Sequence, residues 1–377
     1  MSAEPEAQGE EAQRSSLKSK LYLSLSSTVF TLILVELLLR LLDIPQIPEP
    51  KQQTVRFQFQ AASPGASPIL VNNPGRITFT YASNPRGYFD DQNQVHHQVN
   101  DKGFRGPEFT PAPPETFRMM VLGDSFTFGE GVNDQDIFPV QAALLFSEKT
   151  STPAVAYNLG VGSYNTTQSL ELLNLYREEL QPDLVVLGYT INDPEPPLFQ
   201  LNAENETYIR VERDIDTDDQ TPPDRLLFRS RIAKAIWNAQ NQRSVTEQTI
   251  AYYQRIHQPD QAGRKESEDS LRQILQICAE QDIPCIVVMF PLMYLLNEDY
   301  PFQEIHQSIG THVTEGGGTF IDLYPHLKNQ DAASLIVHSS DHHPNERVHH
   351  LAGKLIAEEA LRTRGAQGPR TSPNSPE

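Results

Sequence analysis

Two short motifs contain residue types that together could cleave an ester. Ser125 lies in the segment GDSF (123–126), and Asp341 and His343 lie in the segment DHHPN (341–345). A serine hydroxyl is a weak nucleophile until a base within hydrogen-bond reach removes its proton, and the imidazole of His343 can act as that base. Asp341 precedes this histidine by two positions, and side chains at that spacing point the same way in an extended segment. Its carboxylate could therefore bond the other ring nitrogen and stabilise the protonated imidazole.

These residues also have structural interpretations. Ser125 could simply cap a helix that follows it, and the segment NDP (192–194) has a common turn composition. The histidines at 342, 343, 349 and 350 could suggest a metal site, but a helix start separates the two pairs and no further acidic or cysteine residue has zinc-ligand spacing. We therefore expect neither a metal nor another cofactor, and expect His349 and His350 to face solvent or to pack.

The elements that must position these motifs begin near residue 117. Short runs that are apolar on both faces alternate from there with amphipathic helical stretches, which is typical of a parallel sheet covered on both sides. The sequence therefore predicts a doubly wound α/β domain. The predicted strands are 119–122, 155–159, 184–187, 283–290 and 320–323, and the predicted helices include 167–180, 268–280 and 345–362.

Four polar motifs each follow one of these strands. GDSF follows the first strand, NLGVGS (158–163) ends the second, the segment 188–193 follows the third, and DHHPN follows the last and opens the terminal helix. The carboxyl ends of the strands in an open parallel sheet share one edge, where ligands bind. We therefore expect the four motifs to converge in space.

Taken together, these blocks resemble those of the SGNH/GDSL hydrolases, in particular their membrane-anchored bacterial members. The resemblance covers residues 117–361, and the blocks GDSFTFG (123–129) and DxHPN are specific in combination; the segment NDKGFR (100–105) is similar to one often found upstream in the anchored members. The resemblance implies a flavodoxin-like, five-stranded parallel sheet. We place the hydrolase domain at 117–363. Its regular pattern is interrupted at 194–263 by prolines, an acidic patch and a basic amphipathic stretch, which we interpret as an insertion.

The family resemblance also assigns roles to individual residues. It implies a catalytic triad of Ser125, Asp341 and His343. It implies that the oxyanion of the tetrahedral intermediate is bound by the Ser125 N–H, a backbone N–H of the second block and the Asn192 side chain. The sequence departs from the family pattern at Ser163, where members usually have glycine, and Gly162 lies one position earlier. The resemblance therefore leaves open which of these two N–H groups is used.

Residues 21–43 are predicted to form a transmembrane helix. The stretch LYLSLSSTVFTLILVELLLRLL (21–42) is long enough to cross a hydrocarbon core of about 30 Å. The basic residues Arg14, Lys18 and Lys20 precede it, which favours a cytoplasmic N-terminus and an extracytoplasmic domain. A cleaved signal peptide is the alternative, but the stretch is long and lacks a small-residue cleavage site. We interpret Glu36 and Arg40 as an i,i+4 pair at the outer boundary.

The remaining segments are less regular. Residues 1–20 and 364–377 are polar and predicted to be disordered, the first as a cytoplasmic tail. Residues 44–116 are predicted to form a proline-rich stalk (44–51) and an irregular accessory layer. In the insertion, Ile232 and Ile236 share a helical face with Phe228, which we expect to pack on the main domain rather than dock on a membrane. Cys278 and Cys285 could bridge, but we favour two buried thiols.

Composition and motifs limit the function. A net charge of −19 disfavours nucleic acid as a partner. The motifs favour an extracytoplasmic serine esterase that removes acyl groups, foremost O-acetyl groups, from an acylated carbohydrate or another ester. The alternatives are a polysaccharide O-acyltransferase of the same fold, which would resemble alginate O-acetyltransferases, and a non-catalytic binding or assembly protein. The sequence does not identify the substrate.

Overall fold

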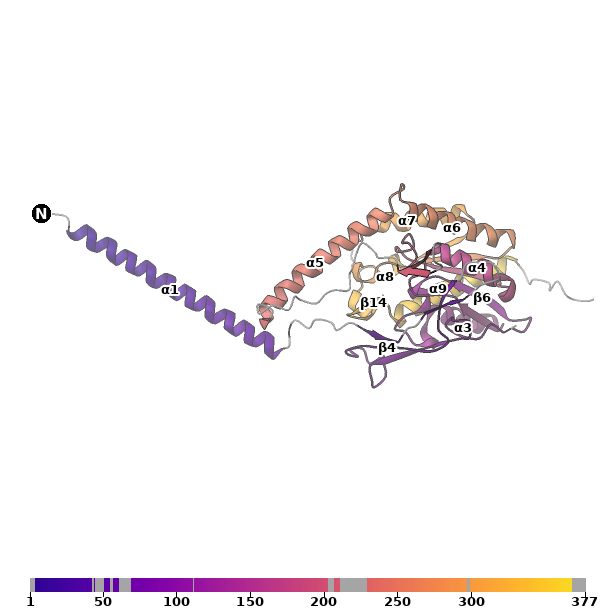
Figure 1. The fold of residues 1–377 in the computed structure, drawn as a ribbon, viewed down its shortest axis with the longest axis horizontal. Coiled ribbons are helices and arrows are strands. Elements are labelled where there is room, and N and C mark those ends of the chain that lie inside the picture. The colour runs from indigo at the N-terminus through magenta and orange to yellow at the C-terminus, as the bar shows by residue number, and fades with distance from the viewer. Residues whose placement is uncertain are drawn as a thin grey trace, which may run out of the picture. The chain divides into compact units, whose positions relative to one another are not determined.

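The computed structural model describes residues 4–42, 44, 51–54, 57–60, 69–110, 112–202, 207–210, 229–296 and 299–367. The chain forms two compact units (Figure 1). The smaller unit consists of Met1–Ile47 and Asp216–Thr249, and the larger unit consists of Pro48–Ile215 and Ile250–Glu377.

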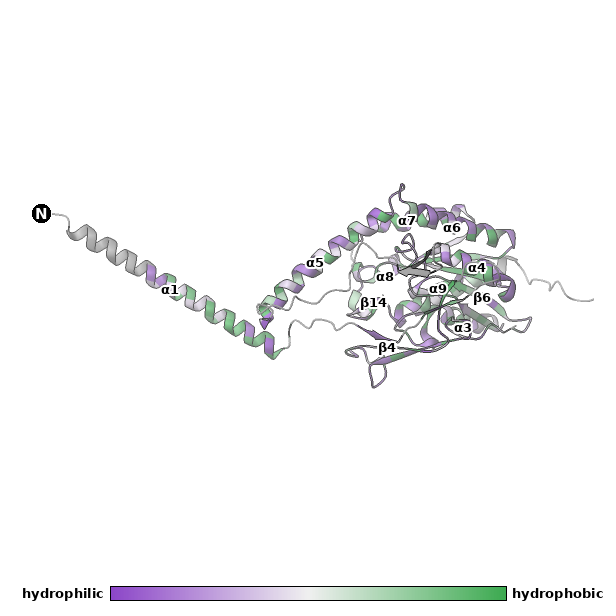
Figure 2. Ribbon diagram, viewed as in Figure 1, coloured by the Kyte–Doolittle hydropathy of each residue, from purple (hydrophilic) through white to green (hydrophobic). Residues whose placement is uncertain are grey.

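The smaller unit contains the apolar helix that the sequence predicts. Helix α1 (Glu4–Leu41) has a segment, Lys18–Leu41, with a mean hydropathy of 1.9 and enough length to cross a membrane. Figure 2 shows its apolar residues, and their side chains are exposed in the structure. The helix starts at Glu4. Residues 4–20 are therefore helical, whereas the sequence predicted that they are disordered. Their Glu, Ala, Gln, Leu and Lys residues are good helix formers and extend a helix that is already nucleated.

Glu36 joins α1 to the start of helix α5 (Arg231–Ile256). The predicted pair with Arg40 is present at 2.7 Å. The Glu36 carboxylate also accepts hydrogen bonds from the Ser230 hydroxyl and from the N–H groups of Arg231 and Ile232, at 2.9–3.1 Å. A carboxylate in this position satisfies N–H groups that have no partner in the first turn of a helix. Glu36 therefore caps α5 in addition to its predicted role.

The predicted apolar face of α5 is not fully buried. Ile236 on this face is 55% exposed. Phe228 and the acidic part of the insertion lie outside the described residues, as does most of the predicted stalk. The insertion also contains a hairpin of β9 (Phe199–Asn202) and β10 (Thr207–Arg210).

The larger unit is built on the predicted five-stranded parallel sheet. Its strands have the order β12-β11-β8-β6-β7, which is the flavodoxin-like order. The middle strands are buried on both faces, which explains their continuous apolar runs. The bounds are β6 (Phe117–Leu122), β7 (Ala154–Asn158), β8 (Leu184–Tyr189), β11 (Cys285–Met289) and β12 (Thr319–Asp322).

Helices form two layers around this sheet (Figure 1). Helix α3 (Phe138–Thr150) packs against α9 (Glu346–Gln367), whereas α4 (Thr166–Leu180) packs against α6 (Ala262–Glu280), which contacts α7 (Gln303–Glu315). Right-handed crossovers on a sheet whose order reverses at β6 place the two groups on opposite faces. Helix α9 extends into the predicted C-terminal tail, and residues 368–377 lie outside the described part of the chain. Cys278 and Cys285 are buried free thiols.

The accessory layer is more regular than predicted. Strands β1 (Gln52–Gln53), β4 (Gly75–Thr80) and β5 (Gln94–Val99) form an antiparallel sheet, and β2 (Phe57–Gln60) pairs with β3 (Ile69–Asn72). The larger of these sheets shares a hydrophobic core with the segment that follows Ser125 and with Val337. Short elements complete the unit, namely α2 (Ser125–Phe128), α8 (Tyr324–Leu327), β13 (Ile336–His338) and β14 (Asp341–Pro344), with single 3₁₀ turns at Asp134–Asp136, Met293–Leu295 and Ala332–Ser334.

Candidate active site

Ser125 lies on a sharp turn between β6 and α2. Gly123, the first residue of this turn, has a φ of +144°, and a Cβ there would lie 2.2 Å from the Thr127 hydroxyl and 2.7 Å from the Gly188 carbonyl oxygen. Only glycine fits this position. Asp124 caps α2 by accepting a hydrogen bond from the Phe126 N–H at 2.9 Å. Because Asp124 is the cap, the Ser125 hydroxyl is available for another partner.

That partner is His343. Its Nε2 atom lies 2.8 Å from the Ser125 Oγ atom, and its Nδ1 atom lies 2.5 Å from Oδ1 of Asp341. Asp341 and His343 belong to β14, so their side chains point to the same side of a strand, as the spacing predicts. The structure therefore brings the three predicted residues into one hydrogen-bonded chain, through which a proton could pass from the serine to the imidazole.

The charges at this site favour an imidazole that accepts protons. Burial opposes ionisation of Asp341, but the charges of Lys51 and His343 outweigh this effect and hold its pKa far below the ordinary value. Burial lowers the pKa of His343, but the carboxylates of Asp341 and Glu130 outweigh burial and raise it above the ordinary value. An ionised carboxylate next to a moderately basic imidazole is the arrangement that general-base chemistry requires.

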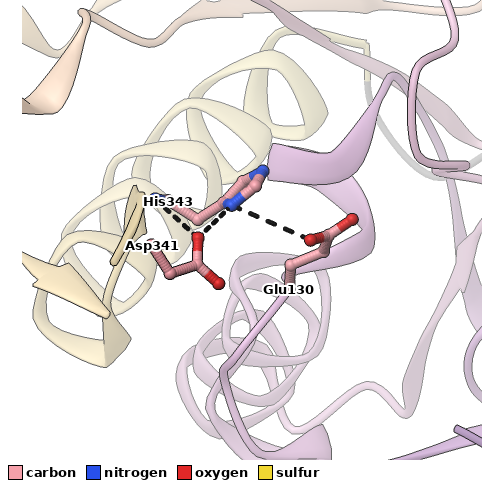
Figure 3. Close-up of side chains that lie close together, drawn as sticks. All are labelled: Glu130, Asp341 and His343. Atoms are coloured by element: carbon pink, nitrogen blue, oxygen red, sulfur yellow. Dashed lines mark hydrogen bonds and ion pairs between the residues drawn. The ribbon is translucent and has the colours of Figure 1, made fainter. Parts of the chain in front are cut away.

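Three side chains that sequence analysis did not identify surround Asp341. Its Oδ2 atom accepts hydrogen bonds from the Tyr81 hydroxyl at 2.8 Å and from the Lys51 ammonium at 2.9 Å. The ammonium also bonds Oε2 of Glu130 at 2.6 Å. Figure 3 shows that Glu130 and Asp341 approach the same ring nitrogen of His343, at 3.8 Å and 2.5 Å. Lys51 is the last residue of the predicted stalk and Tyr81 lies in the predicted irregular layer, and no motif distinguishes either of them.

Glu130, Asp341 and His343 are spaced closely enough for one ligand atom of each to share an ion. The donor set does not fit such a site, because the Lys51 ammonium already bonds both carboxylates. The histidine has both ring nitrogens bonded, one to Asp341 and one to Ser125. We therefore assign these residues to an internal charge network.

A small cavity of about 260 Å³ opens next to Ser125. Two of the residues assigned to the oxyanion hole, Ser163 and Asn192, line it together with Ser125, whereas Gly162 is not among its lining residues. Of the two N–H groups left open by the sequence, this favours that of Ser163. The remaining lining residues are Phe126, Glu130, Thr190, Ile191, Tyr253, Phe290, Pro291, Leu292 and His343.

The backbone at Ser163 explains the usual glycine at this position. Its φ of +66° lies in the left-handed region, which residues with a Cβ rarely adopt. The turn thus has the conformation expected of glycine even though a serine occupies it. The cost is on the order of 1–2 kcal/mol, which the surrounding structure must offset.

Polar groups hold the loop that carries Asn192. Thr190 bonds the side chains of Asn192 and Asp124, the latter at 3.0 Å, and its N–H donates to Asp193 at 2.8 Å. Burial and the nearby Asp124 raise the pKa of Asp193 to about 8. Burial also lowers the pKa of His257 to about 4, so its neutral imidazole can donate to the Ile191 carbonyl oxygen at 2.8 Å.

Arg105, the last residue of the NDKGFR segment, supports the loop after α2. Its guanidinium is fully buried and donates to the carbonyl oxygens of Phe128, Gly129 and Val132 at 2.5–2.7 Å, and it pairs with Asp134. Glu130 lies within this loop. Through Arg105, the segment therefore helps to fix the position of Glu130, which lines the pocket.

The other histidines of these motifs, His342, His349 and His350, contact different partners. His349 is buried, accepts a hydrogen bond from the Phe138 N–H at 3.1 Å and stacks on the Phe138 ring. His350 is partly exposed and lies 3.1 Å from Asp136. The ring of His342 packs near Tyr294.

Comparison with solved structures returns several distant similarities. A two-domain esterase active on acetylated mannans is 11% identical, with a TM-score of 0.40 over 68% of this chain and 52% of that chain, so this chain spans about half its length. A lipase/acylhydrolase from Enterococcus faecalis is 15% identical, with a TM-score of 0.38 over 68% and 100% of the two chains. LAE5, an α/β hydrolase from the metagenome of Lake Arreo, is 14% identical, with a TM-score of 0.39 over 70% and 100%. No curated protein sequence matches the chain.

The family assignment rests on sequence. The model of the GDSL-like Lipase/Acylhydrolase family matches residues 121–351, which is more than half of the chain and includes Ser125, Asn192, Asp341 and His343. The chain therefore belongs to the GDSL-like lipase/acylhydrolase family and is a serine hydrolase that acts on ester bonds.

Proposed function

We propose that the protein is an extracytoplasmic, membrane-anchored esterase that removes short acyl groups, foremost O-acetyl groups, through a triad of Ser125, His343 and Asp341. The observation that carries this proposal is the 2.8 Å hydrogen bond between the Ser125 hydroxyl and the His343 Nε2 atom, continued at 2.5 Å to Asp341. An arrangement of this kind activates a serine in unrelated hydrolases.

In the first half of the reaction, the Ser125 Oγ atom attacks the ester carbonyl carbon and its proton passes to the His343 Nε2 atom. Asp341 stabilises the imidazolium that results. The Ser125 and Ser163 N–H groups and the Asn192 amide donate to the oxyanion. When the intermediate collapses, the leaving alcohol takes the proton from His343 and the acyl group remains on Ser125.

In the second half, water replaces the alcohol. His343 removes a proton from the water, which attacks the acyl carbon, and the second tetrahedral intermediate collapses to a carboxylic acid and free Ser125. The serine recovers its proton from His343. The steps balance without any external cofactor or redox partner.

The size and lining of the cavity support a small acyl group. Drug-sized ligands generally occupy pockets of about 300–1,000 Å³. The cavity here measures about 260 Å³, with Phe126, Phe290 and Leu292 as apolar walls. An acetyl group fits such a volume more easily than a long fatty acyl chain.

The apolar helix supports the proposed location. Lys18–Leu41 is long and apolar enough to span a membrane, and Arg14, Lys18 and Lys20 lie at its N-terminal end. Basic residues usually remain on the cytoplasmic side, which would put the hydrolase domain outside the cytoplasm. An enzyme held there would meet acylated carbohydrates of the cell surface, which we propose as its substrate class.

A test is hydrolysis of p-nitrophenyl acetate, butyrate and octanoate by the full-length protein in detergent, with the Ser125→Ala variant as control. We expect hydrolysis of the acetate to be fastest and to disappear in the variant. Added oligosaccharide should leave the yield of free acetate unchanged, with no acetylated sugar formed. Transfer of acetyl to the sugar would instead indicate an acyltransferase, and failure to cleave any ester would contradict the proposal.

A further inference from the structure

Lys51 reaches the site from a segment that precedes the family domain. It directly precedes β1, which pairs with β4 so that Gln52 lies opposite Thr80 and Gln53 lies opposite Phe79. The Thr54 N–H continues this pairing to the Thr78 carbonyl oxygen at 3.1 Å. These backbone bonds fix the place where the lysine side chain begins.

The lysine side chain is enclosed at its far end. Its ammonium lies 5.3 Å from the centre of the Phe79 ring and bonds Asp341 at 2.9 Å and Glu130 at 2.6 Å. The side chains of Lys51, Glu130 and Asp341 are only 20%, 15% and 1% exposed. At this depth the charges interact through a medium that screens them less than water does.

Lys51 sets the net charge of the groups that lie behind the imidazole. Glu130 and Asp341 contribute two negative charges beside the imidazole of His343, and Lys51 contributes one positive charge. The net charge behind the imidazole is then −1, as for a single aspartate. Without Lys51, the imidazole would face two carboxylates. That of Glu130 lies 3.8 Å from the imidazole, and Lys51 is the cation described in contact with it.

We propose that Lys51 is a positioning residue of the esterase, which neutralises Glu130 and holds Asp341 against His343 so that the imidazole can act as a base near neutral pH. This inference rests on the triad proposed above. Lys51 touches neither Ser125 nor the cavity, so it acts through the two carboxylates. Lys51 thereby supports the active site from outside the matched family domain.

The expected effect of Lys51 is on the pH dependence of the reaction. Burial lowers the pKa of His343, Asp341 and Glu130 raise it, and Lys51 lowers it. Removal of Lys51 should therefore raise it further, so that the imidazole stays protonated, and inactive as a base, to higher pH. The titratable or charged groups that act on His343 are Asp341, Glu130, Lys51, Asp124, His342 and His349.

The test compares variants of the full-length protein in detergent. We would measure the second-order rate of Ser125 labelling by a fluorophosphonate between pH 5 and 9 for wild type, Lys51→Met, Lys51→Arg, Glu130→Gln and the double variant Lys51→Met/Glu130→Gln. Lys102→Met is the matched control, because Lys102 also precedes the matched family domain and pairs with a carboxylate, that of Glu179 on α4, but at a more exposed place. Thermal melts would show that each variant is folded.

We expect the acid limb of the Lys51→Met profile to move to higher pH by about one unit or more, as an uncompensated charge at this distance implies. The Arg variant should keep the limb near the wild-type position, and the double variant should return toward it because it restores the net charge. Lys102→Met should overlay wild type. A Lys51→Met profile that overlays wild type, or a double variant that keeps the full shift, would overturn the inference.

A second measurement separates this inference from the proposed function. Histidine labelled with ¹³C at Cε1 allows the His343 pKa to be followed by NMR, with His343→Gln used to assign its signal. The measurement requires no turnover. If wild type hydrolyses no ester, the proposed function fails, whereas a raised His343 pKa in Lys51→Met still supports the electrostatic role of Lys51 and an unchanged one refutes it.

Discussion

The Tyr81 hydroxyl donates a hydrogen bond of 2.8 Å to Asp341, the residue whose other carboxylate oxygen bonds His343. Tyr81 is almost fully buried, and burial together with the Asp341 charge raises its pKa, so it remains a donor at all ordinary pH values. The accessory layer, and not only the family domain, therefore holds the carboxylate in place.

Replacement of Tyr81 by Phe should weaken both stability and catalysis. The buried Oδ2 atom of Asp341 would lose one partner, which costs about 1–3 kcal/mol. We expect kcat/KM to fall roughly tenfold, equivalent to about 1.4 kcal/mol of transition-state stabilisation. Urea unfolding and ester hydrolysis would measure the two effects.

Tyr88→Phe is a matched control for this variant. Tyr88 also donates to a carboxylate, that of Asp136, at 2.8 Å. The hydrogen bonds described for its hydroxyl are to Asp136 and Asn133, and neither residue belongs to the triad. Its loss should reduce stability without a comparable loss of kcat/KM. If Tyr81→Phe and Tyr88→Phe reduce kcat/KM equally, the link between Tyr81 and the triad is wrong.

Asn192→Ala should lower kcat by a factor of about 10²–10³, the usual effect of removing one oxyanion donor. The Asn192 side chain lines the cavity, whereas Thr190, Asp193 and His257 hold the backbone of its loop, so the fold should survive. Asn174→Ala, on the exposed face of α4, serves as control. A kcat lowered by less than about threefold in Asn192→Ala would contradict the assignment of Asn192 to the oxyanion hole.

Ser163 allows a test of the backbone conformation at the second block. Glycine adopts a φ of +66° without strain, so Ser163→Gly should retain activity and gain up to about 1 kcal/mol of stability. Ser163→Val keeps the same backbone N–H but adds a branched Cβ, and should lose about 1–3 kcal/mol. Unfolding curves in which valine is tolerated better than glycine would contradict the left-handed conformation.

Parts of this architecture follow from the sequence, and others do not. The strands at 119–122 and 184–187 were predicted because strands buried on both faces carry continuous apolar runs, and the shared edge of a parallel sheet then predicted that Ser125 and His343 would meet. By contrast, Lys51 and Tyr81 lie 290 and 260 positions from Asp341. Their segment has no periodicity that would reveal such a contact.

The same reason explains why the sequence did not predict that Glu36 caps α5. The spacing of Glu36 and Arg40 predicted their i,i+4 pair, but the hydrogen bond from Ser230 to Glu36 joins residues 194 positions apart. Nor could the sequence decide between Gly162 and Ser163, because the preference depends on which of them lines the cavity next to Ser125. Local patterns thus predicted the elements and the motifs, whereas charge partners from distant short strands required the structure.

The raised pKa of His343 predicts the pH dependence of the wild-type enzyme. Only the neutral imidazole can accept the serine proton, so kcat/KM should rise with pH and reach half of its maximum above pH 6.5. The pKa of Asp341 is far below the ordinary value, so Asp341 should add no second acid limb above pH 5. A half-maximum below about pH 6 would contradict the assigned charges.

The most direct test of the central claim is covalent labelling of the folded, full-length protein with a fluorophosphonate, followed by peptide mass spectrometry. If Ser125 is activated by His343 and Asp341, wild type should carry a single adduct on Ser125, and Ser125→Ala should carry none. His343→Ala should react more slowly by a factor on the order of 10³ or more. A folded wild-type protein with no adduct, or with its adduct on another serine, would contradict the account.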